Sequence, residues 1–166
     1  MARNGRRKPL AVDTNLLLDL ARESDAAHEL REVFQAAGYT FLAGPTVFEE
    51  LGYAALHGNE LERTLAQQAV AQAAQWGIQP FQLSDVERTV AERFAQRLLD
   101  RGLLPEDEFN DAAILGETSL AGIPLLVTSD KHLLDIDAAA LALAFNDADL
   151  PAVHPVHPKA LLRALR

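Results

Sequence analysis

The sequence contains no cysteine in its 166 residues. This absence excludes disulfide frameworks, thiolate nucleophiles, and zinc or iron–sulfur sites held by cysteine. It also fits a reducing compartment, so we expect a cytoplasmic protein.

Long apolar runs are missing as well. The longest one, Ala138 to Phe145, falls far short of the ~20 residues that a membrane-spanning helix needs. No apolar segment follows the arginines near the N-terminus, as a secretory leader would require. We therefore expect neither membrane insertion nor secretion.

Positive charge is scarce, because 15 Lys and Arg stand against 24 Asp and Glu and give a formal net charge of −9. Taken alone, this balance disfavours nucleic acid, whose phosphates usually meet a basic surface. An acidic excess has two different origins, however. The carboxylates are either spread over a solvated surface or gathered around a metal ion.

The length fits one domain, and short apolar runs alternate along it with segments of helical periodicity. Strands are expected near residues 9–12, 39–43, 78–83, 124–128 and 152–156, and helices are expected between them. Since no two-residue hairpin signal occurs, this order predicts an α/β fold with a mainly parallel sheet covered on both faces.

Three local expectations follow from the same patterns. Residues 1–8 form a basic, flexible tail that contains four cations, and residues 9–166 form the single domain. Residues 135–149 are either a short helix or a loop insertion. The spacing of four between the large apolar residues of 85–101 predicts one stripe facing the core, made of Val86, Val90, Phe94 and Leu98.

Four acidic residues coincide with the ends of these elements. Asp13 and Asp130 directly follow predicted strands, while Glu50 and Asp111 lie near the beginnings of predicted helices. Ligands of open α/β sheets collect beyond the carboxyl ends of the strands. The four carboxylates therefore point toward the same end of the sheet.

Each acid also has an ordinary structural explanation. Asp13 and Asp130 are suited to N-caps or Asx turns, and Asp111 is suited to the positive end of a helix dipole. Glu50 fits an exposed helix position, and its neighbour Glu49 competes for any role given to it. The conjunction of four such positions favours a site over four separate caps.

Convergence of the four carboxylates requires a positive partner. At ~5 Å and an effective dielectric of about 20, each pair repels by roughly 3 kcal/mol. Mg²⁺ or Mn²⁺ are the natural partners, because these ions prefer carboxylate and water oxygen. A site of this kind supports metal-assisted displacement at phosphorus.

The stretches that carry the acids resemble, in order, the motifs of the PIN-domain ribonucleases, which include the VapC-type toxins of bacterial toxin–antitoxin pairs. The matching stretches are VDTN at 12–15, PTVFEEL at 45–51, NDAAIL at 110–115 and LVTSD at 126–130. The last strand and helix, at 153–165, resemble the end of the family's domain. The resemblance implies a three-layer α/β/α sandwich that hydrolyses RNA phosphodiesters with Mg²⁺ or Mn²⁺.

Carried over residue by residue, the resemblance assigns the four metal-binding acids of the family to Asp13, Glu50, Asp111 and Asp130. It assigns residues that support the pocket to Asn15 and Thr128, with Ser129 as a further candidate. Glu50 is preferred to Glu49 because the family's acid usually precedes a leucine. One of the three acids at 106–108 can replace or supplement Asp111, so Asp107 stays open against it.

Cations are needed at the rim of such a pocket if RNA is to bind. Arg93, Arg97 and Arg101 recur at a spacing of four, although a stripe of this kind is also typical of a solvated helix face. Lys131 adjoins Asp130. The ten aromatic residues fall mostly on core stripes or strands, so we expect no platform for stacking bases.

Beside RNA, the expected partners are an antitoxin protein and a second copy of the chain in a homodimer. Two other functions compete with the ribonuclease. One is a PIN-like scaffold without catalysis that acts through a protein partner. The other is a receiver-like signalling domain, which requires an acidic pair after its first strand and an aspartate after a middle strand. Neither feature is present at 13–15 or 78–83.

Overall fold

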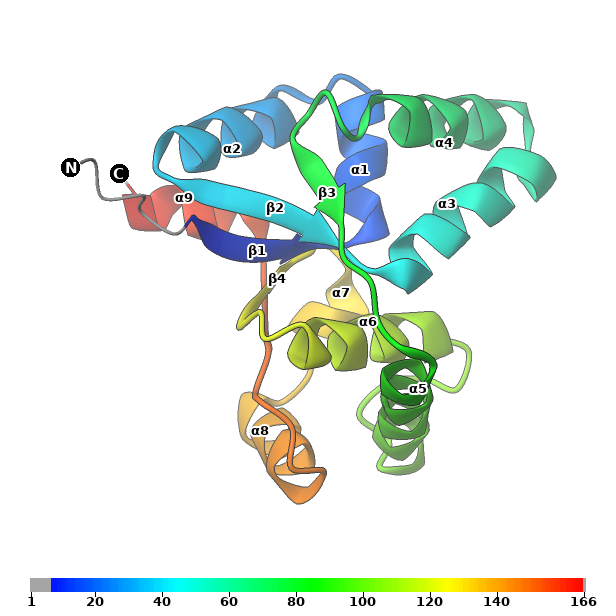
Figure 1. Cartoon of the computed structure of the whole chain (residues 1–166), viewed down its shortest axis with the longest axis vertical. Helices are drawn as coiled ribbons and strands as arrows, with labels where there is room; N and C mark the ends of the chain where they lie inside the picture. The colour runs from blue at the N-terminus through cyan, green and yellow to red at the C-terminus, as the bar shows by residue number, and fades with distance from the viewer. Residues whose placement is uncertain (1–6, 166) are drawn as a thin grey trace.

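A parallel sheet of five strands runs through the described part of the molecule, in the order β3-β2-β1-β4-β5 (Figure 1). The computed structural model describes residues 7–165. Every strand pairing in it is parallel, which confirms the predicted sheet. The strands are β1 (Lys8–Val12), β2 (Tyr39–Ala43), β3 (Ile78–Pro80), β4 (Leu125–Val127) and β5 (His154–Val156).

Helices cover both faces of this sheet, which gives the expected three layers. In Figure 1, α1, α2 and α4 lie above the sheet and α5, α6 and α8 lie below it. The helices are α1 (Thr14–Ala21), α2 (Asp25–Ala36), α3 (Pro45–His57), α4 (Glu60–Gln72), α5 (Asp85–Asp100), α6 (Phe109–Leu120), α7 (Lys131–Leu134), α8 (Ala138–Asp147) and α9 (Pro158–Leu165). Within residues 7–165, none of them combines the length and apolarity that crossing a membrane requires.

Helix starts are set by local polar side chains. Asn59 and Ser84 each accept a hydrogen bond from a backbone N–H in the first turn of their helices, and Glu62 and Glu87 bond back to the cap residues. These capping boxes satisfy amide groups that have no partner inside the helix. At the other end of α2, Gly38 turns the chain into β2 with φ +92, a region that side chains rarely adopt.

The segment at 135–149 contains a helix, α8, which the sequence left open between a helix and a loop. Leu141, Ala144 and Phe145 are buried, and the Phe145 ring stacks on Phe94 of α5 with 4.6 Å between the ring centroids. This long-range contact places α8 under the sheet beside α5. Local periodicity over ten residues did not decide it.

The predicted apolar stripe of α5 is wrong in its first half. Val86 is 74% exposed and Val90 is 37% exposed. The buried residues of this helix are Ala91, Phe94, Ala95 and Leu98. A helix has 3.6 residues per turn, so positions four apart drift by about 40° at each step. The buried face follows spacings of three and four together.

The predicted tail at 1–8 is too long at its end. Residues 1–6 lie outside the described part of the chain. Lys8, however, is the first residue of β1, and its backbone N–H donates to the Gly38 carbonyl oxygen at 3.1 Å. The sheet therefore begins one residue before the expected domain start.

Candidate metal centre

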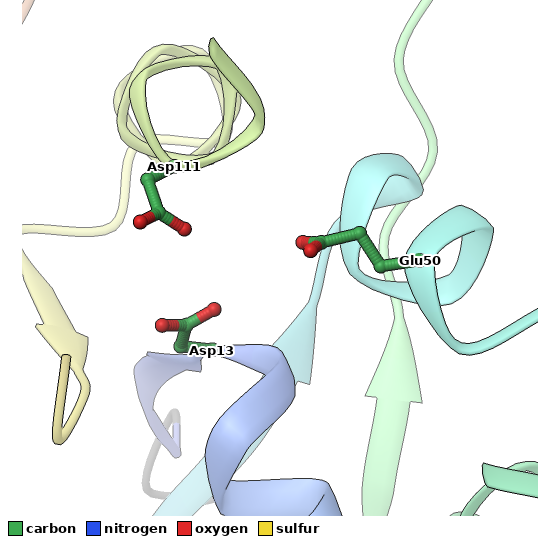
Figure 2. Close-up of side chains that lie close together, drawn as sticks. All are labelled: Asp13, Glu50 and Asp111. Atoms are coloured by element: carbon green, nitrogen blue, oxygen red, sulfur yellow. The ribbon is translucent and has the colours of Figure 1, made fainter. Parts of the chain in front are cut away.

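Carboxylates from four different elements meet at the carboxyl-terminal end of the sheet. Figure 2 shows Asp13, Glu50 and Asp111 pointing toward one another from the start of α1, from α3 and from α6. One oxygen of each lies within 4.8 Å of the others, and Asp111 forms a second such group with Glu108 and Asp130. The structure thus brings together all four acids chosen from the sequence and adds Glu108.

Asp13 has the most constrained position in this cluster. Its side chain is 2% exposed, and its two oxygens accept hydrogen bonds from the Thr14 backbone N–H at 2.6 Å and the Thr128 hydroxyl at 2.8 Å. It is also the N-cap of α1. The ordinary structural role and the place in the cluster therefore hold at the same time.

Thr128 connects the two acids that follow strands. Its hydroxyl donates to Asp13 and accepts from the backbone N–H of Asp130 at 3.0 Å. Asp130 in turn caps α7 by accepting from the backbone N–H groups of His132 and Leu133. Thr128 is fully buried, and its two hydrogen bonds hold the ends of β1 and β4 in a defined relation.

The choice between Glu49 and Glu50 follows from the direction of each side chain on α3. Glu50 accepts a hydrogen bond from the Thr14 hydroxyl at 3.0 Å. It also lines the cavity that the clustered carboxylates share, which we call the acidic cavity. Glu49 points to α5 and forms an ion pair with Arg88 at 2.6 Å. Adjacent helix residues diverge by about 100°, so only one of the two reaches the cluster.

A buried carboxylate outside the cluster orients α3. Glu117 of α6 is 3% exposed, and its oxygens accept from the Thr46 backbone N–H at 3.0 Å and the Thr46 hydroxyl at 2.6 Å. Thr46 lies in the first turn of α3. This pairing fixes the start of α3 against α6, and thereby the distance between Glu50 and Asp111.

Asp111 has an unsatisfied oxygen. The residue is 8% exposed, and its Oδ2 atom is buried without a hydrogen-bond partner among the described residues. An unpaired buried carboxylate oxygen is costly, since burial removes its hydration. Its neighbour Glu108 is itself 3.7 Å from the His132 ring nitrogen. A cation among these oxygens would satisfy the free one.

Burial dominates the electrostatics of the cluster. It raises the pKa of Glu50 to about 7, against a lowering effect of the Thr14 hydrogen bond. Burial also raises the pKa of Asp13 and of Asp111, and for Asp111 the hydrogen bond with Glu108 and the charge of Asp13 add to the rise. Without a cation, the cluster therefore retains protons near neutral pH.

The remaining candidates from the sequence divide into two sets. Asn15 lines the cavity together with the acids. Thr128 does not line it but donates a hydrogen bond to Asp13, which does. Five side chains are exposed and do not line it, namely Ser129, Lys131, Arg93, Arg97 and Asp107. Arg101, also expected on the basic stripe, forms an ion pair with Asp147 at 2.8 Å.

The acidic cavity has a volume of about 430 Å³ and extends beyond the carboxylates. Leu18, Ala54 and Leu65 form an apolar part of its wall. Among the described residues that line it, Arg22 is the one cation, held by Asp19 at 3.2 Å. The sequence did not single out Arg22, although Arg22 directly follows α1, the helix that Asp13 caps at its other end.

Comparison with protein families shows which family the chain belongs to. A family model for the PIN domain matches residues 10–139, which include every carboxylate of the cluster. The chain belongs to the PIN domain family. This PIN domain therefore does not correspond to the receiver-like alternative. No curated protein sequence matches the chain.

Two solved structures with the same fold come from bacteria. A chain of VapBC2 from Rickettsia felis, bound to a DNA fragment from their promoter, superimposes with a TM-score of 0.60 at 15% identity, covering 90% of this PIN domain chain and 98% of that one. A chain of VapBC-1 from nontypeable Haemophilus influenzae gives 0.56 at 11% identity, covering 91% and 98%. At these identities the likeness establishes the shared fold.

The donor set of this PIN domain matches hard divalent ions. Five carboxylates offer oxygen atoms to an ion, and neither of the two groups contains histidine or cysteine. Oxygen-only coordination is typical of Mg²⁺ and Mn²⁺ and unfavourable for soft metals. The residues present therefore fit such an ion, and the free Asp111 oxygen gives it a ligand with no competing hydrogen bond.

We expect Mn²⁺ to stabilise the protein more at pH 8 than at pH 6. Glu50 has a folded pKa of about 7, above the 4.5 of an ordinary glutamate, so its contribution to stability is lost as pH rises through 7 in the absence of metal. At pH 6 the ion must displace the proton of Glu50, while at pH 8 that carboxylate is already charged. Ion at a hundredfold excess over its Kd adds about 2.7 kcal/mol.

Thermal unfolding with EDTA or with Mn²⁺ at both pH values measures this difference. Glu117 also titrates with a pKa raised by burial, so the metal-free slope alone is not diagnostic and the increment produced by Mn²⁺ is the measured quantity. The variant Glu50→Gln should reduce the difference between the two pH values. Equal increments at pH 6 and pH 8 would contradict the assignment.

Proposed function

We propose that this PIN domain is an endoribonuclease that requires Mg²⁺ or Mn²⁺ and hydrolyses RNA phosphodiester bonds. The observation that carries the proposal is the buried Asp111 Oδ2 atom, which has no described partner and lies amid carboxylates within 4.8 Å. A non-catalytic scaffold has no need for this convergence. A nuclease needs it, because cations held there neutralise the scissile phosphate.

Each part of the cluster has a role in the proposal. Asp13, Glu50, Asp111 and Asp130 hold the ion, with Glu108 as an additional ligand from the start of α6. When bound, a divalent ion supplies a nucleophilic water and stabilises the leaving oxygen. Thr128 and Thr14 orient Asp13 and Glu50 through their hydrogen bonds, and we place Asn15 at the wall beside them.

The variant Asp13→Asn should lose RNA cleavage on the order of 100-fold or more, since even residues behind metal ligands cost 10–100-fold when replaced. Asparagine keeps the size of the side chain and an oxygen for the Thr14 N–H, so the fold should be retained. The measurement is cleavage of a mixed pool of single-stranded RNA with Mg²⁺ or Mn²⁺.

Asp107→Asn is the matched control, because Asp107 is exposed and does not line the cavity. It should cleave RNA like the wild type. The proposal fails if the wild type cleaves no RNA with either ion, or if Asp13→Asn cleaves as well as Asp107→Asn.

We further propose that Arg22 binds an RNA phosphate beside the scissile one. It lines the same cavity as the acids, whereas Arg93 and Arg97 do not. Arg22→Ala should raise KM about tenfold, equivalent to the loss of ~1.4 kcal/mol of binding, with a smaller change in kcat. Arg97→Ala is the control and should leave KM unchanged. Equal effects of the two variants on KM would contradict the assignment of Arg22.

The similar structures extend the proposal to a biological role. Both come from VapBC assemblies, and one of these is bound to DNA from its promoter. We propose that this chain is the toxin of a toxin–antitoxin pair, and that a small DNA-binding antitoxin encoded beside it is its partner. Its RNA substrate fits the cytoplasmic location expected from the absence of cysteine.

Expression of the chain alone in a bacterial host should arrest growth, because unpaired nuclease would degrade cellular RNA. Expression of Asp13→Asn at the same level should not. Growth curves with matched protein amounts measure the effect, and co-expression of the neighbouring gene should restore growth. Normal growth with active wild-type protein would point to RNA processing instead. The homodimer remains a prediction of the sequence, to be tested by sedimentation.

A further inference from the structure

A second cavity adjoins the acidic one at Glu50. It has a volume of about 450 Å³, and Glu50 and Ala54 line both cavities. The other lining residues are Thr46, Glu49, Tyr53 and Asn110. Whatever fills it therefore lies beside the candidate metal centre, with α3 on one side and the first turn of α6 on the other.

Tyr53 is the unusual residue in this cavity. It is 69% exposed, although the other large aromatic side chains of the described chain mostly belong to the core. Its ring contacts the His57 ring one turn later on α3, with 4.6 Å between centroids and a tilt of 42°. That contact restricts the orientation of the ring and leaves most of its surface accessible.

The polar groups around Tyr53 are unequal in their availability. Thr46 is occupied by Glu117, and Glu49 is occupied by Arg88. For Asn110 and the Tyr53 hydroxyl, the described chain provides no hydrogen-bond partner. The cavity therefore offers an aromatic face, an amide and a hydroxyl to a ligand.

Charge decides which part of a nucleotide fits. No cation lines this cavity among the described residues, and its carboxylates are Glu50 and the Arg88-paired Glu49, so a phosphate finds no positive partner there. A neutral base meets no such penalty and gains from stacking on an aromatic ring. Arg22, which lines the first cavity, provides the opposite environment.

We propose that Tyr53 is the platform on which one base of single-stranded RNA stacks, next to the phosphodiester held at the metal centre. This inference rests on the proposed function, since RNA is the ligand in both. It differs from the expectation from the sequence that no stacking platform exists, because Tyr53 is exposed. The base lies in the cavity beside α3, and its polar edge faces Asn110.

The test separates the base from the backbone. The probe is a fluorescein-labelled 12-nucleotide RNA of mixed sequence, and the reference is a ribose-phosphate chain of the same length without bases. Binding is measured by fluorescence anisotropy with Ca²⁺ in place of Mn²⁺. Tyr53→Ala should weaken binding of the intact RNA about tenfold and change binding of the abasic chain less than twofold.

Two further variants distinguish stacking from apolar contact. Tyr53→Phe keeps the ring and should bind intact RNA like the wild type, whereas Tyr53→Leu should resemble Tyr53→Ala. Because Tyr53 is exposed, these variants should unfold at the wild-type temperature, which thermal unfolding verifies. The proposal is overturned if Tyr53→Ala weakens both probes equally or neither.

The outcomes also separate this inference from the nuclease activity. If the wild type cleaves RNA while Tyr53→Ala binds both probes normally, the stacking site is wrong and the nuclease stands. If the wild type cleaves no RNA, yet Tyr53→Ala binds intact RNA more weakly than the wild type does, the nuclease is wrong and the stacking site stands. If Tyr53→Ala only converts a dimer into a monomer in sedimentation, the face binds a second copy and the inference fails.

Discussion

Mutual repulsion among buried and half-buried carboxylates is the constraint on which the rest of this structure depends. Asp13, Glu50, Glu108, Asp111 and Asp130 lie in two overlapping groups whose oxygens are within 4.8 Å of one another. At this separation each charged pair costs roughly 3 kcal/mol at an effective dielectric of about 20. The fold must hold them against that force, and the acids themselves supply part of the attachment. Asp13 and Asp130 cap helices while facing the cluster, so each is held by backbone N–H groups that cannot move away.

Buried hydroxyl and carboxyl groups behind the cluster complete this framework. Thr128 joins the ends of β1 and β4, and Thr14 reaches across to Glu50 on α3. Glu117 holds the beginning of α3 against α6 through Thr46. These contacts connect elements that are distant in sequence, and each fixes one wall of the cavity. The geometry of the site is therefore a property of the packed layers and not of any one motif.

Net charge has a different meaning once the carboxylates are located. The formal charge of −9 argues against a polyanionic partner only if the acids are spread evenly. Here five of them gather at one end of the sheet, where divalent ions would reverse the local sign. One lining cation, Arg22, belongs to the acidic cavity, and one exposed aromatic, Tyr53, belongs to the adjoining cavity that shares Glu50 with it. Recognition in our proposal thus depends on a few placed contacts.

By itself, the sequence determined the α/β class, the parallel sheet and the four principal acids, because strand ends, helix starts and short motifs are local signals. It did not determine that α8 packs on α5, that Val86 is exposed, or that Tyr53 borders the site. It also left Glu49 against Glu50 to a family pattern, whereas the structure separates them by the Arg88 ion pair and the Thr14 hydrogen bond. Among the three acids at 106–108, only the structure singles out Glu108, and Arg22 joined the cavity only in three dimensions. Periodicity shows which face of a helix is apolar, but which element lies opposite that face depends on packing between residues far apart in the chain.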